Sequence, residues 1–72
     1  MANMQAVELT PRQEEVCVLV ALGMSNKAIA REIGLSVYTV EVHLSNISQR
    51  LPGFGSPRQK IIRLYTAPFL SE

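Results

Sequence analysis

Apolar residues recur along the chain at the spacing of helices, in stretches that open with helix-capping residues. The first stretch opens at residues 10–13 with Thr-Pro-Arg-Gln: an N-cap, a proline at the first helical position and a glutamine that completes a capping box. The apolar residues Val16, Leu19, Val20 and Leu22 follow, and Gly23 supplies a left-handed end. This pattern predicts a first helix over residues 11–22.

Two further helices are separated by a very short turn. Ser25 caps a helix that is apolar at Ala28, Ile29 and Ile33, and Gly34 ends it. Ser36 then caps a longer helix, whose apolar residues recur at spacings of three and four: Val37, Val40, Leu44, Ile47 and Leu51. Helices joined by so tight a turn must cross steeply, which predicts a helix-turn-helix unit with its second helix presented outward.

A fourth helix is predicted beyond a turn at Pro52-Gly53-Phe54-Gly55. Residues 56–59, Ser-Pro-Arg-Gln, repeat the start signal of the first helix almost letter for letter. We expect this helix to run to about Thr66 and Pro68 to stop it. Since no segment shows strand alternation, we predict an all-α fold of four helices.

Length and composition restrict the class of protein. The 72 residues suffice for one domain, and 47% hydrophobic against 18% charged residues exclude a disordered polar tail. Without a signal peptide or an apolar run of membrane-spanning length, we expect a cytoplasmic protein that does not contact membranes. One cysteine, Cys17, and one histidine argue against a metal site, and Cys17 is expected to be a buried small hydrophobe.

Charge is divided unevenly along the chain, whose net charge is only +1. Residues 1–25 carry three glutamates against one arginine, and residues 26–66 carry six basic residues against two glutamates. This polarity fits a domain with one face toward phosphates, and ordinary solvated charge would produce it equally well.

The third predicted helix carries the candidate chemistry. The side chains opposite its apolar stripe are short and lightly charged, and such side chains can meet base edges in a major groove. Val42 suits a thymine methyl, Gln49 an adenine and Glu41 a cytosine N4. The candidate base-reading residues are Tyr38, Glu41, Val42, Ser45 and Gln49. The alternative is an ordinary exposed helix face.

Phosphates would be held by Lys27, Thr39 and Arg50, together with backbone N–H groups where the second and third helices begin. His43 has no Ser, Asp or Cys partner pattern around it, so we assign it a phosphate-binding or helix-supporting role rather than catalysis. The chain also lacks a glycine-rich phosphate loop, paired carboxylates at working spacing and a nucleophile with a base, so an enzyme is not expected.

Three ordered strings of residues carry a resemblance to a known family. They are Leu9-Thr10-Pro11-Arg12-x-x-Glu15-Val16, Gly23-x-Ser25-Asn26-Lys27-x-Ile29-Ala30-x-x-Ile33-Gly34-Leu35-Ser36 and Thr39-Val40-x-Val42-His43-x-x-Asn46-Ile47. In these strings the chain resembles the LuxR/GerE-type DNA-binding domain of bacterial or phage regulators, and the resemblance weakens but persists through residues 56–64. It implies that the third helix enters the major groove and that the fourth pairs two copies on an inverted repeat.

The resemblance also assigns residues to roles. Glu41, Val42 and Ser45 fall where base readers lie. Backbone or supporting contacts to DNA are expected from Ser25, Asn26, Lys27, Ser36, Thr39, His43, Asn46 and Arg50. The dimer seam would hold Ile61, Ile62, Tyr65 and Phe69. The surplus of apolar residues over 61–70 supports such a seam, and its alternative is that all of them pack on the first and third helices.

The chain departs from the family pattern at three places. Glu41 stands where a basic residue is common, and Ser45 where some members have a second base-reading lysine. The loop at residues 52–55 is one residue longer than usual, with Pro52 where glycine is common, which bears on the angle of the fourth helix.

The predicted organisation is a leader over 1–8, the DNA-binding domain over 9–66 and a tail over 67–72, as in a small standalone member of the family. We predict a sequence-specific transcriptional regulator that binds double-stranded DNA as a homodimer, with no cofactor or small-molecule ligand. The alternative is an interaction protein that binds DNA weakly and inhibits another regulator by pairing with it.

Overall fold

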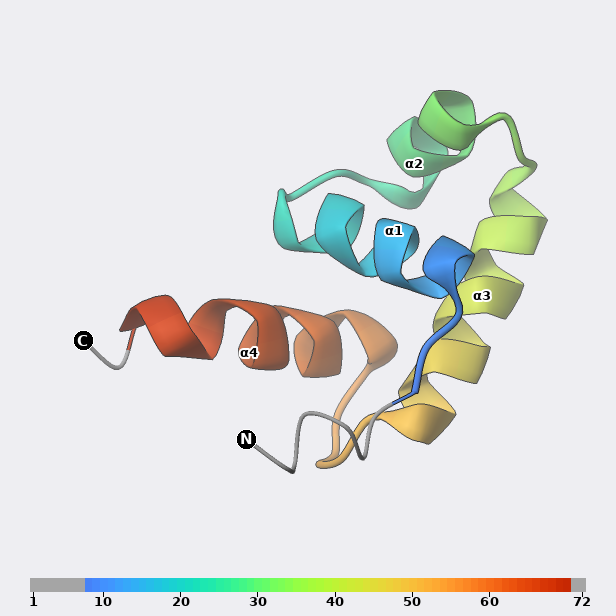
Figure 1. Ribbon diagram of the computed structural model, residues 1–72. Helices are drawn as coiled ribbons and strands as arrows, with labels where there is room; N and C mark the ends of the chain where they lie inside the picture. The colour runs from blue at the N-terminus through green and yellow to red at the C-terminus, as the bar shows by residue number, and fades with distance from the viewer. Residues whose placement is uncertain (1–7, 71–72) are drawn as a thin grey trace.

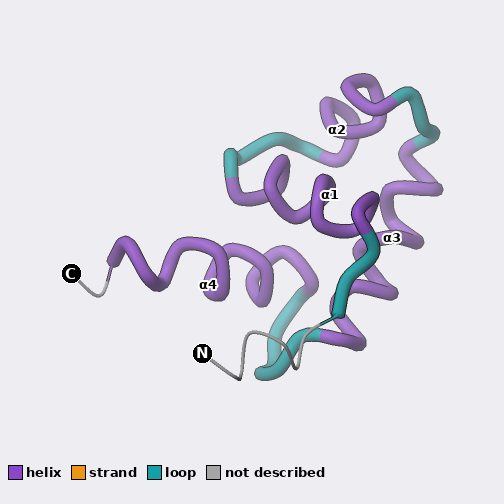
Figure 2. Tube along the Cα trace, viewed as in Figure 1, coloured by secondary structure: helices purple, strands orange, loops and turns teal. Residues whose placement is uncertain are grey.

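The computed structural model describes residues 8–70, with side chains to residue 66, and shows four helices and no strand over this range. The helices are α1 (Pro11–Ala21), α2 (Asn26–Ile33), α3 (Val37–Arg50) and α4 (Pro57–Leu70) (Figures 1 and 2). The all-α prediction is confirmed. The predicted leader, apart from Glu8, and the end of the predicted tail lie outside the described residues, so the division at residues 9 and 66 stays a prediction.

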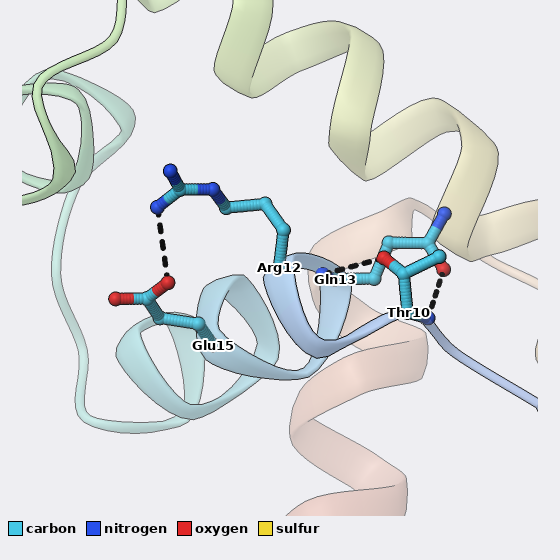
Figure 3. A network of polar contacts seen from close by, with 4 residues as sticks. All are labelled: Thr10, Arg12, Gln13 and Glu15. Atoms are coloured by element: carbon cyan, nitrogen blue, oxygen red, sulfur yellow. Dashed lines mark hydrogen bonds and ion pairs between the residues drawn. The ribbon is translucent and has the colours of Figure 1, made fainter.

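The helices begin where their capping residues predicted. The Thr10 hydroxyl accepts from the Gln13 N–H at 3.1 Å while the Gln13 side chain accepts from the Thr10 N–H at 2.9 Å, which forms the capping box drawn in Figure 3. Ser56 and Gln59 make the same reciprocal pair before α4. A cap of this kind contributes about 1 kcal/mol. Local hydrogen bonds therefore explain why the helix starts are readable from the sequence.

The turn between α2 and α3 depends on a left-handed glycine. Gly34 is the C-cap of α2 at a φ of 72°, and the Leu35 N–H donates to the Ala30 carbonyl at 2.9 Å. A Cβ at Gly34 would meet no atom within 4 Å, so a larger residue would be opposed there by backbone conformation rather than by a clash. Ser36 directly follows as the cap of α3, so the direction of the chain changes within three residues.

The hydrophobic core lies where the other three helices pack against α1 (Figure 1). It takes residues from every helix, as well as Leu51 just after α3: Val16, Cys17, Val20, Ile29, Ala30, Val40, Leu44, Ile47, Leu51 and Ile61. Aliphatic side chains dominate this core, and Cys17 is one of its fully buried members. The predicted burial of Cys17 is confirmed.

Three details of the sequence prediction are wrong. Val37 belongs to the apolar stripe of α3 by position but is exposed, because at the first residue of the helix nothing covers the end of the stripe. Leu22 is exposed as well, as the C-cap beyond the last residue of α1. Pro68 does not stop α4, which continues to Leu70, because a proline has a helix-compatible φ and costs a helix one backbone hydrogen bond and a clash with the preceding turn rather than forbidding it.

Candidate nucleic-acid interface

The helix α3 lies at the edge of the molecule, with one side on the core and the other free of the rest of the chain (Figure 1). Val40, Leu44 and Ile47 form the inner side and are buried. Since α2 precedes it across a three-residue turn, the pair has the helix-turn-helix arrangement in which the second helix is available to a groove of DNA.

The five candidate base-reading residues share the outer side of α3, which we call the reading face: Tyr38, Glu41, Val42, Ser45 and Gln49. All five are exposed, Val42 by 39% and Tyr38 by 73%. Of the wider set of candidates on α3, Asn46 and Arg50 are also exposed, and Thr39 and His43 are half-buried on the flank. The tertiary structure thus gathers the candidates on one accessible surface.

The hydroxyls of Ser25 and Ser36 act first as helix caps. Ser25 accepts from the Ala28 N–H at 3.1 Å and Ser36 from the Thr39 N–H at 3.0 Å. The Thr39 hydroxyl lies 2.9 Å from that of Ser36, so the two can share one hydrogen bond. The other first-turn N–H groups of α2 and α3 have no partner within their helices, which is the arrangement that binds phosphate at a helix N-terminus.

Two other candidates are engaged within the chain. The Asn26 side-chain oxygen accepts from Arg58 Nη2 at 3.0 Å, and Arg50 Nη1 donates to the Glu8 carbonyl at 3.1 Å. Asn26 therefore acts as a support at the start of α2. Arg50 keeps an exposed guanidinium with further donors, and Lys27 is exposed one residue after Asn26.

The arginine that holds Asn26 was not singled out by the sequence. Arg58 Nη2 also donates to the Met24 carbonyl, 34 residues away along the chain. Arg58 further lines a hollow of about 310 Å³ between the start of α2, the middle of α3 and the start of α4, together with Asn26, Glu41, Leu44, Ser45, Ser56 and Pro57. No local pattern could have identified this role, because both acceptors of Arg58 lie more than 30 residues before it in the chain.

The candidates for a dimer seam divide between core and surface. Ile61 is fully buried in the core, so it has no surface to offer a partner and its assignment to the seam is wrong. Ile62 is 42% exposed, and Leu64, which belongs to the apolar surplus over 61–70 but not to the four seam candidates, is 38% exposed. Tyr65 is half-buried, and the side chain of Phe69 lies outside the described residues.

Tyr65 and Cys17 meet between α4 and α1, and both are held in their neutral forms. Burial raises the pKa of the Cys17 thiol, and an interaction with the Tyr65 hydroxyl only partly opposes this. Burial and the contact with Cys17 raise the pKa of Tyr65 to about 12. A thiol with a raised pKa in an apolar surrounding is a poor nucleophile, so this pair is structural.

In the described part of the chain, the His, Cys, Asp and Glu residues form no group of three that could hold a metal ion. None of its helices is both long and apolar enough to cross a membrane.

Comparisons with known proteins agree with this geometry. The family model described as bacterial regulatory proteins of the luxR family matches residues 7–62. The chain is 39% identical over 44 residues to the tetrathionate response regulatory protein TtrR of Salmonella typhimurium, and 36% identical over 44 residues to the nitrate/nitrite response regulator protein NarL of Escherichia coli. It is 46% identical over 43 residues to the transcriptional regulatory protein UhpA of Escherichia coli.

These matches cover 60–61% of the chain but only 20–22% of the relatives, so the chain spans about a fifth of their length. No solved structure matches the chain at comparable significance. The match to the family model over most of the chain confirms the resemblance seen in the sequence. The chain therefore belongs to the LuxR family of bacterial regulatory proteins and is a DNA-binding transcriptional regulator domain rather than an enzyme.

Proposed function

We propose that this chain is a cytoplasmic, sequence-specific regulator that reads bases in the major groove through the reading face of α3. The observation that carries the proposal is the division of α3 into two sides. Its inner side is buried, and its outer side presents to solvent three polar residues, of which only Glu41 is charged, together with Tyr38 and Val42. Such residues match the donors, acceptors and methyl groups of base edges.

Individual residues of the reading face suit particular bases. The Glu41 carboxylate can accept from a cytosine N4 amino group, and the Val42 methyls can contact a thymine methyl. The Gln49 amide can bind the two major-groove edge atoms of an adenine. A well-aligned side chain of this kind discriminates against a wrong base by about 1–3 kcal/mol. The half-site we expect therefore contains C, T and A contacts within one turn of duplex.

Sequence-independent affinity would come from cations and helix starts beside the reading face. Lys27 and Arg50 are exposed basic residues on α2 and α3, and the first-turn N–H groups of both helices lie at capped ends, where a phosphate can bind. Thr39, His43 and Asn46 flank these groups as supporting contacts.

We further propose that two copies pair through α4 and read an inverted repeat. Ile62 and Leu64 leave apolar surface on this helix, and apolar side chains on a short domain gain stability when a second copy covers them. A two-fold axis would present the two reading faces to half-sites about one helical turn apart.

A second candidate function is supported by Glu41. An exposed carboxylate on the reading face repels phosphates, and the net charge of the chain is only +1. A domain that binds DNA weakly but keeps its pairing helix would act as an interaction protein that blocks another regulator.

The experiment that tests the proposal is selection of bound duplexes from a random-sequence pool at two salt concentrations. We expect an inverted repeat whose binding weakens linearly with the logarithm of salt, with a slope of about −0.9 per phosphate contact. If no sequence is enriched and no binding is detected at low salt, the proposal fails.

Substitution of Glu41→Lys separates the two candidate functions. A large gain in affinity for all duplexes indicates a natural chain tuned away from DNA. Loss of sequence preference without a gain in affinity indicates that Glu41 reads a base.

A further inference from the structure

The hollow at the junction of α2, α3 and α4 brings together two opposite charges that the sequence places 17 residues apart. Its lining includes Glu41 from the reading face and Arg58 from the first turn of α4. Ser45, one turn after Glu41, lines it as well, so the hollow reaches the surface at the reading face. The structure thus places an arginine in the lining of the same hollow as the acidic residue that departs from the family pattern.

The guanidinium of Arg58 is held at the start of α2 by two hydrogen bonds. Arg58 is half-buried, and its Nη2 donates both to the Met24 carbonyl and to the Asn26 side-chain oxygen at 3.0 Å. Because a guanidinium carries five N–H donors in a rigid fork, these two bonds leave donors for a further acceptor. The orientation of the group is therefore decided by the start of α2 and not by Glu41.

The Glu41 carboxylate, in contrast, is not held by the rest of the described chain. Within residues 8–66, Glu41 makes no hydrogen bond and no ion pair, and the ion pair found in this range joins Arg12 to Glu15. An exposed glutamate on a DNA-reading helix faces the repulsion of the phosphates on both sides of the groove. A cation in the same hollow lowers this repulsion and limits the directions in which the carboxylate can point.

We propose that Arg58 is a positioning residue of the reading face, whose guanidinium offsets the charge of the Glu41 carboxylate across the hollow and holds this carboxylate when the domain binds DNA. The inference rests on the proposed function, since it assigns Glu41 to the surface that meets DNA. It adds a residue outside the helix-turn-helix unit to the determinants of recognition, and it links the start of α4 to the choice of base at Glu41.

The test is a double-mutant cycle with Glu41→Gln and Arg58→Met, in the full chain. The dissociation constant is measured for the duplex selected by the wild-type chain and for a scrambled duplex. We expect Arg58→Met to weaken binding about tenfold more when Glu41 is present than in the Glu41→Gln background, because only the carboxylate needs the offset. Effects that add across the cycle would overturn the inference.

Two further variants separate charge from structure. Arg58→Lys keeps the charge but cannot reproduce the forked bonds to Met24 and Asn26, and we expect it to restore most of the lost affinity. Arg63→Met removes the same charge from α4, where Arg63 lies on the Phe54 ring and donates to the Phe54 carbonyl rather than into the hollow. Arg63→Met should change the dissociation constant by the same factor with and without Glu41. An equal coupling for Arg63 would attribute the result to net charge and overturn the assignment to Arg58.

A DNA-free measurement distinguishes failure of this inference from failure of the proposed function. We expect Glu41→Gln to lower the melting temperature by about 2–3 °C at low salt in the wild-type background, and by less in the Arg58→Met background. Equal shifts in both backgrounds would show that the two charges do not interact across the hollow, and would overturn the inference while DNA binding persists. Failure of the proposed function is recognised instead when neither the wild-type chain nor the Glu41→Lys variant binds any duplex at low salt.

Discussion

The helices α3 and α4 both have 14 residues and follow a capping serine, yet they contact the rest of the chain in different ways. The inner side of α3 is a buried apolar stripe. In α4 the fully buried apolar residue of the described side chains is Ile61, and three basic side chains each donate to a backbone carbonyl. These are Arg58 to Met24, Lys60 to Ser48 and Arg63 to Phe54.

The difference explains what each helix can offer to a partner. A helix held by an apolar stripe keeps its polar side chains for solvent or DNA. The helix α4 leaves apolar side chains such as Ile62 and Leu64 at the surface, where a second copy can cover them. This difference supports the two proposed contacts, groove reading for α3 and protein pairing for α4.

The largest loss of stability should come from truncating a buried side chain in the apolar stripe of α3. Ile47 is fully buried, so Ile47→Ala removes packed methyl groups and should lower the free energy of unfolding by about 2–5 kcal/mol, a large share of the stability of a domain this small. Urea unfolding followed by circular dichroism measures it. The matched control, Gln49→Ala on the exposed side of the same helix, should change stability by under about 0.5 kcal/mol.

Removal of exposed apolar surface from α4 should act on pairing instead. Ile62→Ser and Leu64→Ser should each weaken self-association by about 1–2 kcal/mol, roughly five- to thirtyfold in the dissociation constant, with little loss of monomer stability. Sedimentation equilibrium measures the association. A wild-type chain that stays monomeric at every concentration would contradict the role of α4, and Ile61→Ser would be expected to unfold the chain rather than to separate a pair.

Loss of a helix cap should have a smaller effect that is similar in the two helices. Ser36→Ala and Ser56→Ala each remove a hydroxyl that accepts from the N–H three residues later, and each should cost about 1 kcal/mol of stability. The two variants should differ in DNA binding. Ser36→Ala should lower the affinity more than Ser56→Ala, because Ser36 lies at the start of α3. An equal loss of affinity for both variants, at temperatures where both are folded, would argue against the proposed contact at α3.

The smallest effect should appear at alkaline pH, where α4 meets α1. Folding raises the pKa of Tyr65 from 10.0 to about 12. The stability that neutral Tyr65 contributes to the fold is therefore fully present below pH 10 and is lost as the pH rises toward 12. The raised pKa of Cys17 acts with the same sign from about pH 9 upward. Thermal unfolding between pH 8 and 12 should show this decline, and Tyr65→Phe should make it shallower. A steeper decline in the variant would contradict the assignment.

Much of the fold could be predicted because its signals are local. The capping pairs at Thr10, Ser25, Ser36 and Ser56 each join residues three apart, and the helix starts follow directly from them. The reading face could be predicted as well, because the helical period places the residues opposite a buried stripe on the outside. Their contact with bases stays a prediction.

Other features could not be predicted because they depend on which surfaces come together. The family resemblance and the surplus of apolar residues placed Ile61 and Ile62 in one candidate seam, and only the packing of α4 buries the first and exposes the second. Pro68 was expected to end the helix, but α4 continues past it, since the φ of a proline is compatible with a helix.

The amino-acid sequence by itself determined the family, the four helix starts, the tight turn between α2 and α3 and the polar character of the reading face. Each of these depends on interactions between residues three or four positions apart, or on a periodicity that a single helix expresses. Tertiary structure alone decided that Arg58 binds Met24 and Asn26 and shares a hollow with Glu41. Hydrogen bonds between residues more than 30 positions apart form only after the helices pack, so no local pattern in the chain records them.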